Sequence, residues 1–311
     1  MLSVSNLRKQ YGDVLAVNDG CFSVSKGECF GLLGPNGAGK TTTISIICGI
    51  LRSDSGQVLI NGQQITSDTS PIKQHIGYVP QDLALYEELD AISNLRLFGA
   101  LYHLSGDTLG KRIDEALTLT GLADRAHEPI TRFSGGMKRR LNIGAALLHD
   151  PDLLIFDEPT VGVDPQSRNA IFDTLKTLQS RGKTLIYTTH YMEEVERLCD
   201  RVAIMDHGQI IANDSLPGLR RLLPDRDRLQ VELTDVGGGN GWLEQLTTLA
   251  GVRLAHLDGT TLTLEIDHIG RDVPTILTWL DTRNFHIRSA STRHTALEDI
   301  FLHLTGRSLR D

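Results

Sequence analysis

The stretch Gly34-Pro35-Asn36-Gly37-Ala38-Gly39-Lys40-Thr41-Thr42 decides the fold. It fits the pattern G-x-x-x-x-G-K-[ST], in which a glycine-rich loop cradles phosphates. The mainly apolar residues 29–33 before it indicate a buried strand, and residues 42–50 after it indicate a helix. A strand, a loop and a helix in this order form the context in which the pattern binds nucleotides. The sequence therefore predicts an α/β protein built around a P-loop.

The residues of this loop have separate tasks at a bound nucleotide. The glycines let the backbone turn so that successive N–H groups point at one anion, and the helix N-terminus adds partial positive charge. We expect Lys40 to reach the β- and γ-phosphates and Thr41 to bind Mg²⁺ through its hydroxyl. The alternative is a glycine-rich turn before an ordinary helix.

Length and composition bound the class of protein. The 311 residues have room for roughly two domains. With 31 basic and 39 acidic residues, the net charge of -8 gives no overall attraction to nucleic acid. The four cysteines show no metal-ligand spacing and indicate reduced, mostly buried thiols. No apolar run is long enough to span a bilayer, and the N-terminus lacks the features of a signal peptide. We expect a cytoplasmic chain that can dock on a membrane protein.

The hydrophobic pattern divides the chain into a first domain, 1–225, and a second, 226–311. Residues 1–30 alternate apolar and polar positions, as in an antiparallel β layer. Apolar residues recur at helical spacing over 82–132, so we expect a helical subdomain of about 82–150 within the α/β core. Asp107 is the expected N-cap of its second helix. Pro217, Pro224 and a mixed-charge run that includes Asp225 and Arg226 mark the domain boundary.

The second domain has a different order of elements. Its pattern predicts a strand at 229–233, a helix at 242–249, a hairpin at 252–257 and 261–266, a helix at 274–280, a strand at 285–289 and a helix at 297–304. This β-α-β-β-α-β order is typical of an α+β, ferredoxin-like domain. Because no catalytic set of residues is visible in it, we expect an accessory role as a dimer clamp, with a small-molecule sensor as the alternative.

Polar residues follow two apolar strands of the first domain. Asp157 and Glu158 come directly after the apolar run 153–156. There, Asp157 is placed to hold Mg²⁺ and Glu158 to act as general base on an attacking water. Without the P-loop, two such carboxylates would indicate a solvated loop. His190 follows the strand 184–189, at the end where α/β proteins bind ligands, although a lone histidine there also fits an ordinary surface position.

A second glycine motif, Ser134-Gly135-Gly136, begins the helix expected at 134–149. A hydroxyl and free N–H groups at a helix start form an anion site. Because the P-loop already supplies one such site, a second suggests a nucleotide held between two chains. ATP would then join a dimer, and its hydrolysis would release the two chains. Without a ligand, the same residues would simply cap a helix.

With these elements in this order, residues 1 to about 225 resemble the ATP-binding-cassette (ABC) ATPases. The resemblance implies a mixed β core with an antiparallel β subdomain and a helical subdomain. It implies Mg²⁺-dependent ATP hydrolysis, with Tyr11 stacked on the adenine and Ser134-Gly135-Gly136 as the signature. It implies as catalytic residues Lys40, Gln81, Glu158 and His190, and as metal contacts Thr41, Gln81 and Asp157.

Two motifs depart from the ABC pattern. Phe133 stands where the signature usually begins with Leu, and Val161 and Val163 replace Ser or Thr and Leu in the loop before the next helix. Neither change removes a phosphate ligand, so we expect competent sites.

Three stretches give a finer resemblance, namely residues 78–86, SGGMKRRL from Ser134, and LEDIFL from Leu297 with Thr305-Gly306-Arg307. They are similar to ATPase subunits of bacterial drug and antibiotic exporters of the ABC-2 type, the daunorubicin-resistance class. This implies a homodimer at the inner face of the membrane, bound to an ABC-2 permease that exports drug, antibiotic or lipid-like cargo. The rim of the permease groove is expected at Leu85, Tyr86 and Glu87. The alternative is an ABC switch acting on ribosomes or DNA, but such relatives carry two cassettes or a long coiled coil.

Overall fold

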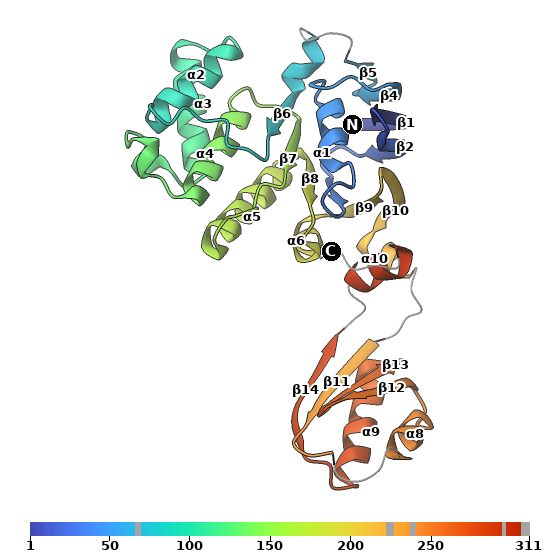
Figure 1. The fold of residues 1–311 in the computed structure, drawn as a ribbon. Helices are drawn as coiled ribbons and strands as arrows, with labels where there is room; N and C mark the ends of the chain where they lie inside the picture. Colours follow the sequence, from blue (N-terminus) through green and yellow to red (C-terminus); the bar gives the residue numbers. More distant parts are fainter. Residues whose placement is uncertain (66–69, 222–226, 237–240, 294–296, 306–311) are drawn as a thin grey trace. The chain divides into compact units, whose positions relative to one another are not determined.

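The computed structural model describes residues 1–311 except 66–69, 222–226, 237–240, 294–296 and 306–311 (Figure 1). The described residues fall into two compact units, which divide in the chain between Leu216 and Pro217. The boundary residues Asp225 and Arg226 and the pair Gly306-Arg307 lie outside the described residues. Within those residues, no helix combines the length and the apolar character that a membrane span requires.

A six-stranded sheet forms the centre of the first unit, in the order β10-β9-β3-β8-β7-β6. Its members are β3 (Cys29–Leu33), β6 (Ile76–Val79), β7 (Leu153–Asp157), β8 (Thr184–Thr189), β9 (Arg201–Asp206) and β10 (Gln209–Ser215). All neighbours run parallel except β9 and β10. Strands β3, β7 and β8 are buried throughout, as parallel strands covered on both faces must be.

The parallel arrangement determines where the predicted site residues meet. Helices α1 (Lys40–Ile47), α5 (Pro165–Ser180) and α6 (Met192–Leu198) follow β3, β7 and β8 in the chain. Parallel strands end at one edge of their sheet. The loops after β3, β6, β7 and β8 therefore bring the P-loop, Gln81, Glu158 and His190 to the same edge.

The predicted antiparallel layer is confirmed as a second sheet in the order β2-β1-β4-β5. It comprises β1 (Leu2–Tyr11), β2 (Val14–Val24), β4 (Ser55–Ile60) and β5 (Gln63–Gln64), and a 3₁₀ turn, η1 (Pro71–His75), precedes β6. Apolar residues of this sheet, such as Leu2, Val17 and Ile60, share one buried cluster with Ile44 of α1. This shared core fixes the β layer against the P-loop helix.

The helical part lies between β6 and β7 and has its own core. It contains α2 (Ala91–Leu101), α3 (Gly106–Leu119), α4 (Gly135–Leu147) and the short 3₁₀ turns η2 (Ala123–Arg125) and η3 (Ile130–Arg132). Leu95, Leu117 and Leu141 are fully or almost fully buried in it. The expected N-cap at Asp107 is wrong, because Ser105 has the extended conformation of the cap and Asp107 lies in the first turn of α3. An acidic side chain is favourable there because of the helix dipole.

The second unit contains a four-stranded antiparallel sheet in the order β12-β13-β11-β14. The helix α7 (Leu216–Arg220) begins at the last residue before the division. The elements that follow it are β11 (Asp227–Leu233), α8 (Gly241–Thr247), β12 (Val252–Asp258), β13 (Thr261–Ile266), α9 (Ile269–Asp281), β14 (Ile287–Arg293) and α10 (Leu297–Thr305). The run from β11 to β14 confirms the predicted ferredoxin-like order. Trp242 and Trp279 both pack in the core of this unit.

One helix boundary in the second unit differs from the expectation. The helix expected to start at Pro274 begins at Ile269, with Pro274 inside it. Proline lacks the N–H that would bond to the carbonyl oxygen of Gly270, four residues earlier, so α9 forgoes that hydrogen bond in its second turn. The carboxylate of Asp272 accepts a hydrogen bond of 2.8 Å from the N–H of His268 and so caps this helix from within.

Candidate active site

The loops at the sheet edge enclose a cavity of about 360 Å³. This volume is in the range of small-molecule sites. P-loop residues form one wall, Gln81 and Glu158 approach from the core, and Val14, Leu15 and Ala16 approach from the start of β2. The structure thus brings the P-loop, Gln81 and Glu158 together as the sequence predicted.

Close contacts explain two glycines of the P-loop. A Cβ atom on Gly34 would lie 2.3 Å from the carbonyl oxygen of Met205, and one on Gly39 would lie 2.2 Å from that of Ala16. Gly39 also has a φ of 103° and is the N-cap of α1. Any larger residue would push the loop away from β2 and β9. These glycines therefore hold the loop against the walls of the cavity.

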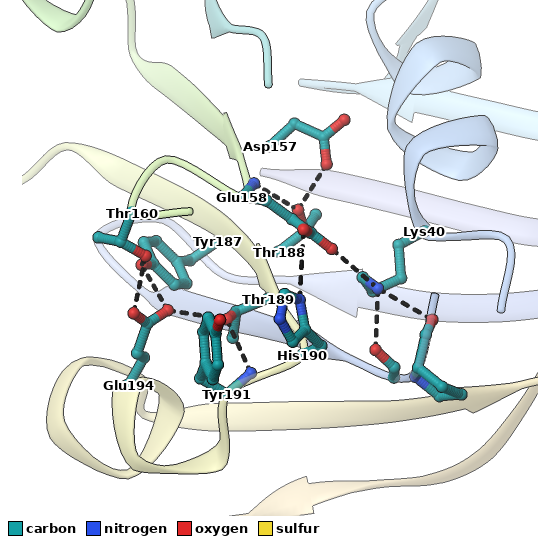
Figure 2. A network of polar contacts seen from close by, with 12 residues as sticks. Lys40, Asp157, Glu158, Thr160, Tyr187, Thr188, Thr189, His190, Tyr191 and Glu194 are labelled. Atoms are coloured by element: carbon teal, nitrogen blue, oxygen red, sulfur yellow. Dashed lines mark hydrogen bonds and ion pairs between the residues drawn. The ribbon is translucent and has the colours of Figure 1, made fainter. Parts of the chain in front are cut away.

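Lys40 is held at the centre of this loop. Its ammonium donates hydrogen bonds to the carbonyl oxygens of Gly34 (2.8 Å) and Pro35 (3.1 Å). It also forms a 3.0 Å ion pair with Oε1 of Glu158, and both side chains are almost fully buried (Figure 2). The P-loop cation and the carboxylate after β7 are therefore direct partners.

Asp157, the last residue of β7, is a buried carboxylate with one free oxygen. Its Oδ1 accepts a 2.6 Å hydrogen bond from Thr188, whereas the described residues offer its buried Oδ2 no hydrogen-bond partner. Burial raises the pKa of this carboxyl, and the hydrogen bond from Thr188 and the nearby hydroxyl of Thr41 oppose the rise. A hard cation prefers such oxygen ligands. The Asp157 carboxylate and the Thr41 hydroxyl therefore fit Mg²⁺.

Glu158 adopts an unusual backbone conformation. Its φ is 45°, in the left-handed region that residues with a side chain rarely occupy. Its N–H donates to the hydroxyl of Thr188 at 2.9 Å, which stabilises this turn. The carboxylate lies between Lys40 and the Nδ1 atom of His190, 3.3 Å away (Figure 2). Strained backbone of this kind is common where an active site fixes one side-chain direction.

An unpredicted arginine holds the loop that carries Gln81. Arg139 of α4 is buried and donates to the carbonyl oxygens of Pro80 (2.9 Å) and Gln81 (2.6 Å). Burial lowers the pKa of this guanidinium. The SGGMKRRL stretch contains this residue, but the motif alone does not show that it points into the protein.

The remaining predicted contacts do not line this cavity. Tyr11 is 49% exposed and lies beneath the ammonium of Lys9, 5.6 Å from the ring centroid. Ser134 caps α4 by accepting a hydrogen bond from the N–H of Met137 at 3.2 Å. A Cβ atom on Gly136 would lie 2.1 Å from Oγ of Ser167, whereas one on Gly135 would meet no atom within 4 Å. Gly136 is thus required for packing against Ser167, whereas the space beside Gly135 is unoccupied.

The comparisons with known proteins agree with this geometry. The sequence pattern of the ABC transporter family matches residues 17–161. The chain is 46% identical over 313 residues to the linearmycin resistance ATP-binding protein LnrL of Bacillus subtilis (strain 168), with 100% of both chains covered. The chain belongs to the ABC transporter family. It is also 38% identical to the Nod factor export ATP-binding protein I of Cupriavidus pinatubonensis, over 100% of this chain and 92% of that one.

Solved structures place this ABC protein among the ATPase cassettes. One ATP-binding subunit of an ABC transporter is 33% identical, covers 71% of this chain and 92% of its own, and has a TM-score of 0.65. A dimeric bacterial ABC transporter cassette is 27% identical over 70% of this chain and 99% of its own, with a TM-score of 0.63. The predictions of an ABC ATPase fold and of an ATP-hydrolysing transporter subunit are thereby confirmed. ABC cassettes dimerise and work with a membrane permease.

Proposed function

We propose that this ABC ATPase drives the export of drug-like, antibiotic or lipid-like cargo through a separate ABC-2 permease. The observation that carries the proposal is the 46% identity to a linearmycin resistance protein along the whole of both chains. Further support comes from the Nod factor export proteins, which also match over the full length of this chain. In such a complex the subunit would sit at the cytoplasmic face of the membrane.

The geometry supports a division of roles at the ATP site. Lys40 would hold the terminal phosphates, and Glu158 would take the proton of the attacking water. His190, next to Glu158, would contact the γ-phosphate, and Gln81 would face the reacting water. Mg²⁺, held by Thr41 and Asp157, would neutralise phosphate charge in the transition state. The left-handed turn at Glu158 supports this assignment because it directs the carboxylate toward the P-loop.

The second half of each ATP site would come from another copy of this chain. Ser134 and Gly135 are absent from the lining of the cavity, and open space surrounds Gly135. The first N–H groups of α4 have no partner within the helix and are suited to an anion. A homodimer would place them over the phosphates bound at the partner's P-loop.

A second cavity, of about 320 Å³, is the proposed seat of a permease helix. It lies between β6 and the helical part, and Ile50, Leu101 and Tyr102 line it. Leu85, Tyr86 and Glu87, the expected rim of the permease groove, do not line this cavity, whereas the neighbouring Ala84 does. The side-chain nitrogen of Asn142 is buried at this groove without a partner in the described part of the chain, so it suits a backbone carbonyl of the incoming helix.

The second unit is proposed as a clamp for the dimer. It has a hydrophobic core of its own, and among its described residues we see no catalytic set. Deleting residues 226–311 should weaken ATP-dependent dimerisation while ATP binding persists. Unchanged dimerisation would contradict the clamp.

Transport into inverted membrane vesicles tests the proposed function. The chain would be co-expressed with an ABC-2 permease, and uptake of labelled linearmycin would be followed with and without ATP. We expect ATP-dependent uptake that disappears in the Glu158→Gln variant. A chain that sediments with ribosomes, and not with the permease, would instead support the alternative of a ribosome-acting switch.

A further inference from the structure

Glu194, near the start of α6, is a buried carboxylate that three hydroxyl groups surround. Its side chain is only 2% exposed. Its Oε1 accepts a hydrogen bond from Thr160 (2.7 Å), and its Oε2 accepts from Tyr187 (2.9 Å) and Thr189 (2.7 Å) (Figure 2). Nε of Arg168 lies 3.7 Å from Oε1 of Glu194. A buried charge is stable only when hydrogen bonds of this kind compensate it.

These hydroxyls belong to the two segments that carry Glu158 and His190. Thr160 lies two residues after Glu158, and Thr189 directly precedes His190. The hydroxyl of Thr189 also accepts a 2.9 Å hydrogen bond from the N–H of Tyr191. The backbone on both sides of His190 is therefore tied to Glu194 through one hydroxyl group.

Side chains on both faces of strand β8 contact residues of the site. Thr188 contacts Asp157 and the N–H of Glu158, whereas Tyr187 and Thr189 point the opposite way, toward Glu194. This alternation is that of any strand. One face thus holds the residues at the phosphate, and the other connects them to α6.

We propose that Glu194 is a positioning residue that keeps His190 aligned with Glu158 for ATP hydrolysis. The inference rests on the proposed roles of Glu158 and His190. Glu194 and its hydroxyl donors are absent from the lining of the nucleotide cavity, so their effect must pass through His190 to Glu158, which does line it. It should accordingly change the rate of the chemical step and leave ATP binding unchanged.

The test compares variants of the full-length chain that differ by single atoms. Thr189→Val removes the hydroxyl at constant shape, and Thr189→Ser keeps it. Since one lost hydrogen bond to a charged group is worth about tenfold in rate, we expect Thr189→Val and Glu194→Gln to lower kcat about tenfold. The KM for ATP should not change, and Thr189→Ser should retain the wild-type kcat. Glu193→Gln, an exposed neighbour on the same helix, is the matched control.

Double variants separate this inference from the assignment of His190. If Glu194 acts through His190, adding Glu194→Gln to His190→Ala should cost little more than His190→Ala alone. A full additional tenfold loss would overturn the positioning role, as would a wild-type kcat in Thr189→Val. Wild-type turnover in His190→Ala would instead refute the proposed role of His190. Thermal unfolding of each variant distinguishes a misfolded protein from a folded protein with a low kcat.

Discussion

The ammonium of Lys40 lies 3.0 Å from the carboxylate of Glu158, and both groups are almost fully buried. The cation expected to hold the phosphate and the expected general base are therefore paired with each other. An incoming phosphate must compete with Glu158 for Lys40. Phosphate binding and placement of the base are thus coupled by one ion pair.

Replacing Glu158 tests this coupling. Glu158→Gln should lower ATP turnover by at least about 100-fold, because an amide cannot accept the proton of water. ATP should bind at least as tightly, since the phosphate no longer competes with a carboxylate for Lys40. Steady-state hydrolysis and a fluorescent ATP analogue measure the two effects, with Glu193→Gln as the control for charge. Wild-type turnover would refute Glu158 as the base.

The two signature glycines should respond differently to alanine. Gly136→Ala should destabilise the fold by about 1–3 kcal/mol, because its Cβ would collide with Ser167. Gly135→Ala should leave the melting temperature unchanged, because its Cβ meets open space. It should nonetheless reduce ATP hydrolysis if a partner copy needs this surface. Full activity in Gly135→Ala would contradict the shared site.

Arg139 should matter more for stability than its neighbour Lys138. Arg139→Lys cannot reproduce the fork that bonds the Pro80 and Gln81 carbonyls, and we expect a loss of about 1–3 kcal/mol in the free energy of unfolding. Among the described residues, the ammonium of Lys138 pairs with the exposed Glu87, so Lys138→Gln should cost under about 1 kcal/mol. Urea titrations followed by circular dichroism compare the two variants. Equal losses would show that the fork contributes nothing.

His149 should make stability depend on pH. Its ring stacks on Tyr102 with centroids 3.6 Å apart, and burial lowers its pKa. As pH falls through the ordinary histidine pKa of about 6.5, the unfolded chain takes up a proton before the folded one, so acid should destabilise the fold. When the pH is lowered from about 8 to about 5, the melting temperature of the wild type should fall further than that of His149→Gln. If the melting temperatures of the two proteins fell equally with pH, His149 would not be the cause of the pH dependence.

The sequence was sufficient to predict the fold and the edge at which the site lies. Apolar runs before the P-loop, Asp157 and His190 identify β3, β7 and β8, because buried parallel strands are continuously apolar. Once those strands are parallel, the residues after them must lie at one edge. The predicted cavity residues Lys40 and Glu158 accordingly meet, as do Glu158 and His190.

The supporting residues could not be predicted in this way. Glu193, Glu194 and Glu196 look alike in the sequence, and only the packing of α6 on β8 turns Glu194 inward. Arg139 bonds a loop 58 residues away, so its role depends on how α4 meets β6. Such contacts follow from tertiary structure and leave no local pattern. Ser105 displaced Asp107 as a cap for a related reason, since either residue satisfies the local preference.

The placement of both tryptophans has a spectroscopic consequence. Trp242 and Trp279 lie in the second unit, whereas the P-loop lies in the first. Intrinsic tryptophan emission therefore observes the ferredoxin-like unit alone. If this emission changes when ATP is added to the unlabelled protein, ATP binding in the first unit has altered the surroundings of a tryptophan in the second. Tryptophan fluorescence of the native chain can therefore measure whether ATP at the cassette affects the second unit.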